Sequence, residues 1–354
     1  MLLSEKTDHI RNNNLDLIRL VAAAMVIWSH AYPIVLGKGA EQPLTALTGG
    51  QFSMGDLGVA IFFVISGFLV SQSMFRLNDL AGYAKARILR IFPGLIFCVL
   101  LSMLLIGPIF TALSTAEYFT NSQTYNYLIA TTTLNFLSPF LPGVFESNPY
   151  DAYINGSLWT LKYEVLCYIT LALSWKLGII TKRRIALLIA GFALLYISTK
   201  NEHLINLAKL SLLFFSGSLF YLYREQIKLD YRLLAASAAA LAGFNYSGHL
   251  NLALPFFGSY VIIYIGYRWD QLLNCTRHGD LSYGLYIYGW PAQQMLIALH
   301  PEMTVLQNII FSIALAIPFA YASWHLIEEP FMRLRKYNLL NPLQKKRPQS
   351  TTPQ

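Results

Sequence analysis

The first long apolar stretch of the chain reads Leu15-Asp-Leu-Ile-Arg-Leu-Val-Ala-Ala-Ala-Met-Val-Ile-Trp-Ser-His-Ala-Tyr-Pro-Ile-Val-Leu36. Its length matches the roughly 20 apolar residues that a transmembrane helix needs. It contains Arg19 and His30, and ionisable groups inside a membrane span are rare enough to suggest a function. Their spacing of eleven positions returns a helix to within about 20° of the same face, roughly 16 Å further along its axis. We therefore expect both side chains to share one face.

The chain as a whole has the composition of a membrane protein. Of its 354 residues, 55% are hydrophobic and 12% are charged, whereas soluble domains have roughly 25% charged residues. Apolar runs recur along the entire length, so we predict an all-α polytopic membrane protein with about ten transmembrane helices. The predicted spans lie near 15–36, 55–75, 91–112, 157–175, 185–199, 204–223, 232–247, 251–269, 281–299 and 304–327.

Basic residues gather at the ends of the predicted spans. This distribution accounts for the formal net charge of +8 without a nucleic-acid-binding surface, and it is typical of cytoplasmic loops under the positive-inside rule. We therefore predict that both termini lie in the cytoplasm. The clusters are Arg76, Lys85, Arg87 and Arg90; Lys176, Lys182, Arg183 and Arg184; Arg224, Lys228 and Arg232; and Arg333, Arg335 and Lys336.

The segment 113–156 departs from this pattern. It contains no Lys or Arg and carries acidic residues such as Glu117 and Asp151. Its most apolar part, 125–141, is interrupted by polar residues and Pro139. We expect an external excursion with a re-entrant or surface-lying element, because irregular backbone at membrane depth must be covered by protein or water.

The chain divides into one membrane domain and a tail. We assign 1–337 to the membrane domain and 338–354, which is rich in Pro, Gln and Lys, to a disordered cytoplasmic tail. Cys98 and Cys167 fall in apolar spans and Cys275 in a predicted cytoplasmic loop, so no pair is placed for an extracellular disulfide. The sequence predicts no metal site.

Two candidate site residues lie on the first span. His30 is in its outer half, where a neutral imidazole can take a proton from a sugar hydroxyl; the alternative is a structural, hydrogen-bonded histidine. Arg19 lies near the cytoplasmic end, where it can snorkel or pair with Asp16 one turn away. The face that it shares with His30 favours a function.

Three further candidates lie on later spans. Arg87 and Arg90 share a helical face at the cytoplasmic mouth of the third span, where paired guanidiniums suit a phosphate; the alternative is ordinary positive-inside charge. Glu164 lies on the order of 10 Å into the fourth span from outside, a depth similar to that of His30. It can support a charged imidazole, as the third group of a triad does, or form an ion pair with Lys162 or with a residue of another span.

Taken together, these segments resemble the acyltransferase family 3 membrane proteins. Each motif is weak alone, but the ordered set extends over nearly the whole chain. In two places many relatives differ from this chain: they have Asp where it has Ala60, and His where it has Gly289. The motifs are Leu15-Asp-Leu-Ile-Arg19 with His30; Gly58-Val-Ala-Ile-Phe-Phe-Val-Ile-Ser-Gly-Phe-Leu69; Arg87-Ile-Leu-Arg90; Ser157-Leu-Trp-Thr-Leu-Lys-Tyr-Glu164; Leu281-Ser-Tyr-Gly-Leu-Tyr-Ile-Tyr-Gly-Trp-Pro291; and Glu328-Glu-Pro-Phe-Met-Arg333.

The resemblance implies an O-acyltransferase of the bacterial inner membrane. It would transfer an acyl group from cytoplasmic acyl-CoA to a hydroxyl of a lipid-linked or polymeric glycan at the outer side of the membrane. Acetyl is the leading candidate for this acyl group. The implied co-substrate is acyl-CoA, with no tightly bound cofactor, and the chain is too short for the fused SGNH domain that some relatives carry. Two rival hypotheses are a secondary transporter or flippase for an anionic glycolipid and a non-catalytic scaffold.

The resemblance also gives the candidate residues their roles. Arg87 and Arg90 would hold the CoA phosphates, and Arg19 would guide CoA within the core. His30 would deprotonate the acceptor hydroxyl or transiently accept the acyl group, with support from Glu164.

Overall fold

The computed structural model confirms the predicted all-α class. Apart from two isolated β-bridges, the regular secondary structure of the described residues is helical, with no strand. The predicted tail 338–354, residue 337 and Cys275 lie outside the described residues. The structure describes residues 1–7, 13–135, 138–273 and 279–336.

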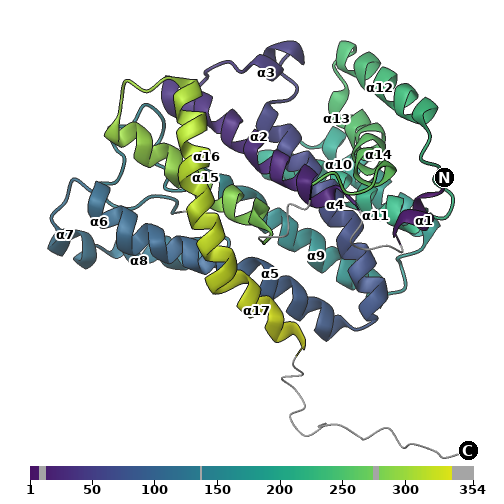
Figure 1. The fold of residues 1–354 in the computed structure, drawn as a ribbon, viewed down its shortest axis with the longest axis horizontal. Coiled ribbons are helices and arrows are strands. Elements are labelled where there is room, and N and C mark those ends of the chain that lie inside the picture. The colour runs from purple at the N-terminus through teal and green to yellow at the C-terminus, as the bar shows by residue number, and fades with distance from the viewer. Residues whose placement is uncertain (8–12, 136–137, 274–278, 337–354) are drawn as a thin grey trace, which may run out of the picture.

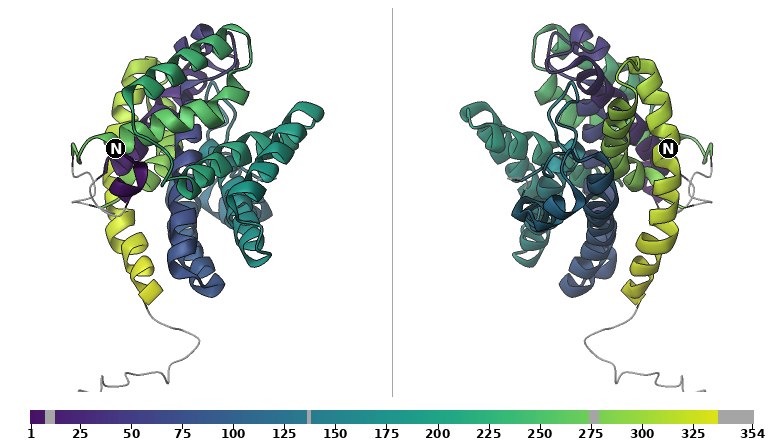
Figure 2. Two further views of the ribbon diagram at one scale, coloured as in Figure 1. Left: turned by 90° about the vertical axis from the view of Figure 1, so that its right-hand side faces the viewer. Right: turned by 90° about the vertical axis from the view of Figure 1, so that its left-hand side faces the viewer.

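The helices pack into a single bundle (Figure 1). The side views in Figure 2 show α16 and α17 running along one side of the bundle. The α-helices are α1 (Leu3–Thr7), α2 (Leu15–Leu36), α3 (Pro43–Leu47), α4 (Met54–Leu77), α5 (Leu80–Leu101), α6 (Gly107–Phe110), α7 (Thr115–Thr120), α8 (Ser122–Thr132), α9 (Leu161–Lys176), α10 (Lys182–Ser198), α11 (Glu202–Leu222), α12 (Tyr231–Tyr246), α13 (Leu250–Ala253), α14 (Ser259–Arg268), α15 (Leu281–Leu299), α16 (Val305–Ser323) and α17 (Glu329–Arg333). The π-helical turns are η1 (Ser102–Ile106), η3 (Leu254–Gly258) and η5 (Trp324–Glu328), and the 3-10 turns are η2 (Gly156–Thr160) and η6 (Leu334–Lys336).

Six helical segments in the described part of the chain are long and apolar enough to cross a membrane. Four other predicted spans are also helical but fall short: α9, α10 and α12 have 16, 17 and 16 residues, and α15 has 19 but carries many Tyr and Gln. The chain is therefore a multi-pass membrane protein, whereas the count of ten spans and their orientation stay predictions. The six segments are Leu15–Leu36, Met54–Leu77, Leu80–Phe110, Glu202–Leu222, Leu250–Arg268 and Val305–Arg333.

Small residues allow the central helices to approach closely. A Cβ on Gly67 would lie 1.8 Å from the Phe214 carbonyl oxygen, and one on Gly217 would lie 2.0 Å from that of Val64. This reciprocal contact brings the backbones of α4 and α11 together, as small residues do between membrane helices. It fixes α4 in the centre of the bundle, where one of its faces lines the site described below.

Side-chain caps determine where several of these helices begin. Ser53 and Asp56 form a reciprocal capping box at the start of α4. Asp79 caps α5 and Asp280 caps α15, in each case by accepting hydrogen bonds from backbone N–H groups of the first turn. The cap of α15 has a second role, because it places the Asp280 carboxylate beside two arginines.

The segment 113–156 contains two short helices, α7 and α8, which lie beside α6 at one end of the bundle (Figure 1). A bridge between Thr111 and Val144 closes the base of the excursion. The 11 residues of α8 extend about 16 Å, too short to cross a hydrocarbon core of about 30 Å. The external location of this segment remains a prediction.

Candidate active site

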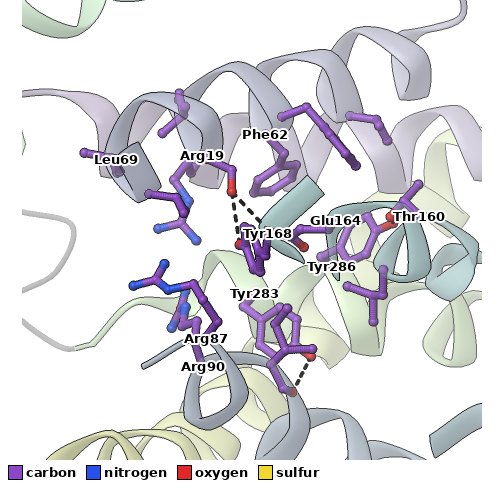
Figure 3. Close-up of a pocket in the computed structure, with 17 residues that line it drawn as sticks. Arg19, Phe62, Leu69, Arg87, Arg90, Thr160, Glu164, Tyr168, Tyr283 and Tyr286 are labelled. Carbon is purple, nitrogen blue, oxygen red and sulfur yellow. Dashed lines mark hydrogen bonds between the residues drawn. The ribbon is translucent and has the colours of Figure 1, made fainter. Parts of the chain in front are cut away.

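A cavity of about 130 Å³ lies among α2, α4, α5, α9 and α15. Four of the five predicted site residues line it: Arg19, Arg87, Arg90 and Glu164. Figure 3 shows the three arginines at one end and Thr160 and Tyr286 at the other. The full lining is Arg19, Val59, Phe62, Phe63, Ile65, Ser66, Leu69, Val70, Arg87, Arg90, Ile91, Thr160, Leu161, Glu164, Tyr168, Tyr283 and Tyr286.

Asp280 joins two of the arginines. Its Oδ2 lies 2.9 Å from Arg19 Nη1 and 2.5 Å from Arg90 Nη2. The predicted partner Asp16 is also within reach of Arg19, but at 3.8 Å. Burial opposes the ionisation of Asp280, yet the two guanidiniums outweigh it and hold the pKa of this carboxyl, just before α15, below its usual value. The bridge therefore ties α2 and α5 to the start of α15.

Arg90 is surrounded by further partners. Its Nη1 lies 3.7 Å from a carboxylate oxygen of Glu328, and its guanidinium packs on the Tyr283 ring at 5.7 Å from the centroid. Glu328 is 1% exposed and belongs to the π-helical turn η5. Such turns often occur at functional sites, and here the turn brings an acid of the last span against the arginine of α5.

Arg87 differs from its neighbour in having no carboxylate close by. Its guanidinium lies 5.9 Å and 5.7 Å from the ring centroids of Tyr83 and Tyr168. None of the carboxylates described in the structure lies within 4 Å of it, and its buried Nε has no hydrogen-bond partner among the described atoms. This cation therefore suits an anionic ligand that enters the cavity.

Glu164 lies in the middle of the cavity, between its two ends (Figure 3). It accepts hydrogen bonds from the Tyr168 hydroxyl at 2.5 Å and the Ser66 hydroxyl at 3.3 Å. Among the described contacts, neither His30 nor Lys162 pairs with it, so neither of the two predicted partnerships is seen. One physical reason is that η2 precedes α9, and a 3-10 helix rises about 2.0 Å per residue, so Glu164 lies further along the axis from Gly156 than it would on a continuous α-helix.

His30 lies outside this lining, next to η2. Its Nδ1 is 3.4 Å from the Ser157 hydroxyl, and its ring packs edge-on against Trp290, with centroids 4.8 Å apart. Arg19 contacts Asp280 at one end of α15 and His30 contacts Trp290 further along it. Both side chains of α2 therefore face α15, as their spacing predicts.

Ser157 links His30 to Tyr286, which lines the cavity together with Thr160. The Tyr286 hydroxyl donates a hydrogen bond to the Ser157 carbonyl oxygen and lies 2.5 Å from the Thr160 hydroxyl. Sequence reasoning gave no role to Tyr286 or to Asp280. The available signal was the helical repeat of Asp280, Tyr283, Tyr286 and Trp290, which puts all four near one face of α15.

The sequence of the chain is similar to that of one known family. A family model described as an acyltransferase domain matches residues 12–327, which is nearly the whole chain. The chain belongs to the acyltransferase family 3. Among the proteins similar to this family member, an O-acetyl transferase of Shigella phage Sf6 is 30% identical over 91% of this chain and 96% of the relative. Nodulation protein 10 of Rhizobium leguminosarum bv. viciae is 29% identical over 91% and 94%. No solved structure matches the chain.

Gly289, one of the two positions at which this chain differs from many relatives, has a packing role in the structure. A Cβ on Gly289 would lie 2.6 Å from a side-chain carbon of Ile27. This member of the acyltransferase family 3 therefore uses the position for close packing of α15 on α2, one turn from His30. A side chain at 289 would require Ile27 to move.

Proposed function

We propose that this protein is an O-acyltransferase of the bacterial inner membrane. It transfers an acyl group from cytoplasmic acyl-CoA to a hydroxyl of an envelope or secreted glycan at the outer side of the membrane. Acetyl is the leading candidate for this acyl group. The observation that carries the proposal is the cavity, which has three arginines at one end, Glu164 in its middle and a lining of largely apolar and aromatic side chains. The O-acetyl transferase of phage Sf6 supports the choice of acetyl.

The arginine end is the entrance for the donor. CoA carries phosphates that guanidiniums bind through planar pairs of hydrogen bonds, and Arg87 has no described carboxylate to compete with them. The pantetheine arm is uncharged, which matches the apolar side chains of the lining in polarity. Its amide N–H groups can donate hydrogen bonds to Glu164, which already accepts them from Ser66 and Tyr168.

His30 receives the acceptor hydroxyl beside Ser157, the residue whose carbonyl oxygen accepts a hydrogen bond from Tyr286 at the end of the cavity. With the Nδ1 proton directed to Ser157, its Nε2 lone pair is available as a general base. The base takes the hydroxyl proton, the oxygen attacks the thioester carbonyl, and CoA leaves as the thiol. In the alternative course, His30 itself accepts the acyl group and passes it on.

Release of free CoA distinguishes this function from that of a transporter, which breaks no thioester. Inverted membrane vesicles that contain the protein and its native glycans are incubated with radiolabelled acetyl-CoA. We expect label in the glycan fraction and an equal amount of free CoA, because each transfer breaks one thioester. Vesicles from a deletion strain are the control, and mass spectrometry of their glycans names the missing group. Glycolipid translocation without thioester loss would contradict the proposal.

Arg87→Lys is expected to weaken acetyl-CoA binding about tenfold or more, because lysine keeps the charge but loses the planar fork. Charge-assisted hydrogen bonds contribute about 1.5–3 kcal/mol each. Affinity is measured by calorimetry on purified protein. Arg76→Lys, at the exposed cytoplasmic-side end of α4, is the matched control. If both variants bind acetyl-CoA equally well, Arg87 does not bind the donor, and its charge serves only to orient the chain in the membrane.

For orientation we propose ten spans with both termini in the cytoplasm, supported by the basic clusters and by the lack of Lys and Arg in 113–156. Single cysteines at Thr115 and Ser147, in a background without the native cysteines, should both react with an impermeant thiol reagent from outside. Labelling of only one would mean that this segment crosses the bilayer.

A further inference from the structure

The end of the cavity that faces away from the arginines is closed by buried side chains. Tyr286 is 7% exposed and Thr160 4%. Their hydroxyls lie 2.5 Å apart, and Tyr286 also donates to the Ser157 carbonyl. The Phe62 ring packs edge-on against Tyr286, with centroids 5.8 Å apart. Three elements, α4, η2 and α15, therefore hold the Tyr286 ring in place.

The fixed wall at Tyr286 limits what can lie against this end of the cavity. The cavity's volume of about 130 Å³ is close to the roughly 150 Å³ of an engineered cavity that holds one benzene molecule. A pantetheine arm that runs from the arginines to Tyr286 therefore has to widen the cavity along its length, whereas the wall at Tyr286 is fixed by hydrogen bonds to Thr160 and Ser157. A longer acyl chain would have to displace the Tyr286 ring and break both of its hydrogen bonds.

The positive charge at one end of the cavity determines how the bound donor is oriented. The anionic end of CoA belongs at Arg19, Arg87 and Arg90, at the opposite end from Tyr286 (Figure 3). The acyl group, at the far end of the pantetheine arm, is then the part that meets Tyr286. This step rests on the proposed function, because it takes acyl-CoA as the donor.

We propose that Tyr286, held by Thr160, determines acyl-chain length. It ends the donor cavity and restricts the enzyme to acetyl and groups of similar size. The selection is steric: each methylene beyond acetyl meets the fixed aromatic ring. Differences of one methylene in an apolar pocket change recognition by roughly 10- to 200-fold.

Binding of acyl-CoAs of different length tests this without knowledge of the acceptor. Purified protein is titrated with acetyl-, butyryl- and hexanoyl-CoA, and the ratio of the hexanoyl Kd to the acetyl Kd is compared. We expect the wild type to bind hexanoyl-CoA at least tenfold more weakly than acetyl-CoA. Tyr286→Ala should reduce that ratio about tenfold or more. Tyr286→Leu, which keeps more volume, serves where the alanine variant does not fold.

Tyr288→Ala is the matched control. This tyrosine is on the same helix and is 3% exposed, but it packs on Phe319 and does not line the cavity. Its substitution should leave the ratio unchanged. A wild type that binds both chain lengths equally, or a folded Tyr286 variant with the wild-type ratio, would overturn this inference alone. A wild type that binds no acyl-CoA would overturn the proposed function together with it.

Discussion

His30→Ala is expected to reduce acyl transfer by about 10²- to 10⁴-fold, the usual contribution of a general base. The affinity for acetyl-CoA should stay within twofold of wild type, because His30 does not line the donor cavity. Transfer is measured as label incorporated into glycan by membrane vesicles, and affinity by calorimetry on purified protein. Loss of transfer with retained donor binding is the result that a base on the acceptor side produces.

The control for this substitution is His249→Ala, because His249 is exposed at the start of α13. It should transfer acetyl at the wild-type rate. Wild-type transfer in His30→Ala would remove the base from the mechanism. A parallel loss of donor affinity would instead mean that His30 contacts acyl-CoA, contrary to its position beside Ser157 and Trp290.

Asp280→Ala is expected to cause the largest loss of stability. Its carboxylate is 14% exposed and contacts Arg19 and Arg90, whose side chains are each 18% exposed. Removing one partner of a buried ion pair costs about 3–5 kcal/mol, since it leaves charge uncompensated. The lost helix cap adds about 1 kcal/mol. Thermal unfolding of the purified protein in detergent measures the effect.

Asp79→Ala separates these two contributions. Asp79 caps α5 through the same kind of backbone hydrogen bonds, but it is exposed and has no ion pair among the described contacts. Asp79→Ala should therefore lower the free energy of unfolding only by the contribution of the helix cap. Similar unfolding temperatures for the two variants would show that the bridge from Asp280 to the arginines contributes little.

Local patterns in the sequence were enough for the class of protein and for the placement of several site residues. Long apolar runs predict membrane helices, because every backbone polar group in the bilayer core must form a hydrogen bond within the protein. Helical periodicity placed Arg19 and His30 on one face of α2, and both do face α15. Arg87 and Arg90, one turn apart, both line the same cavity.

The partners of those residues were decided only by tertiary packing. Asp280 is 261 positions from Arg19 and 190 from Arg90, and periodicity names the face of a helix but not the helix opposite it. Glu164 meets Ser66 and Tyr168 instead of His30, because η2 and the packing of α9 set its depth. The closed end at Tyr286 likewise exists only where α4, η2 and α15 meet. Sequence alone thus determined which side chains enter the bundle, and packing determined what each of them meets there.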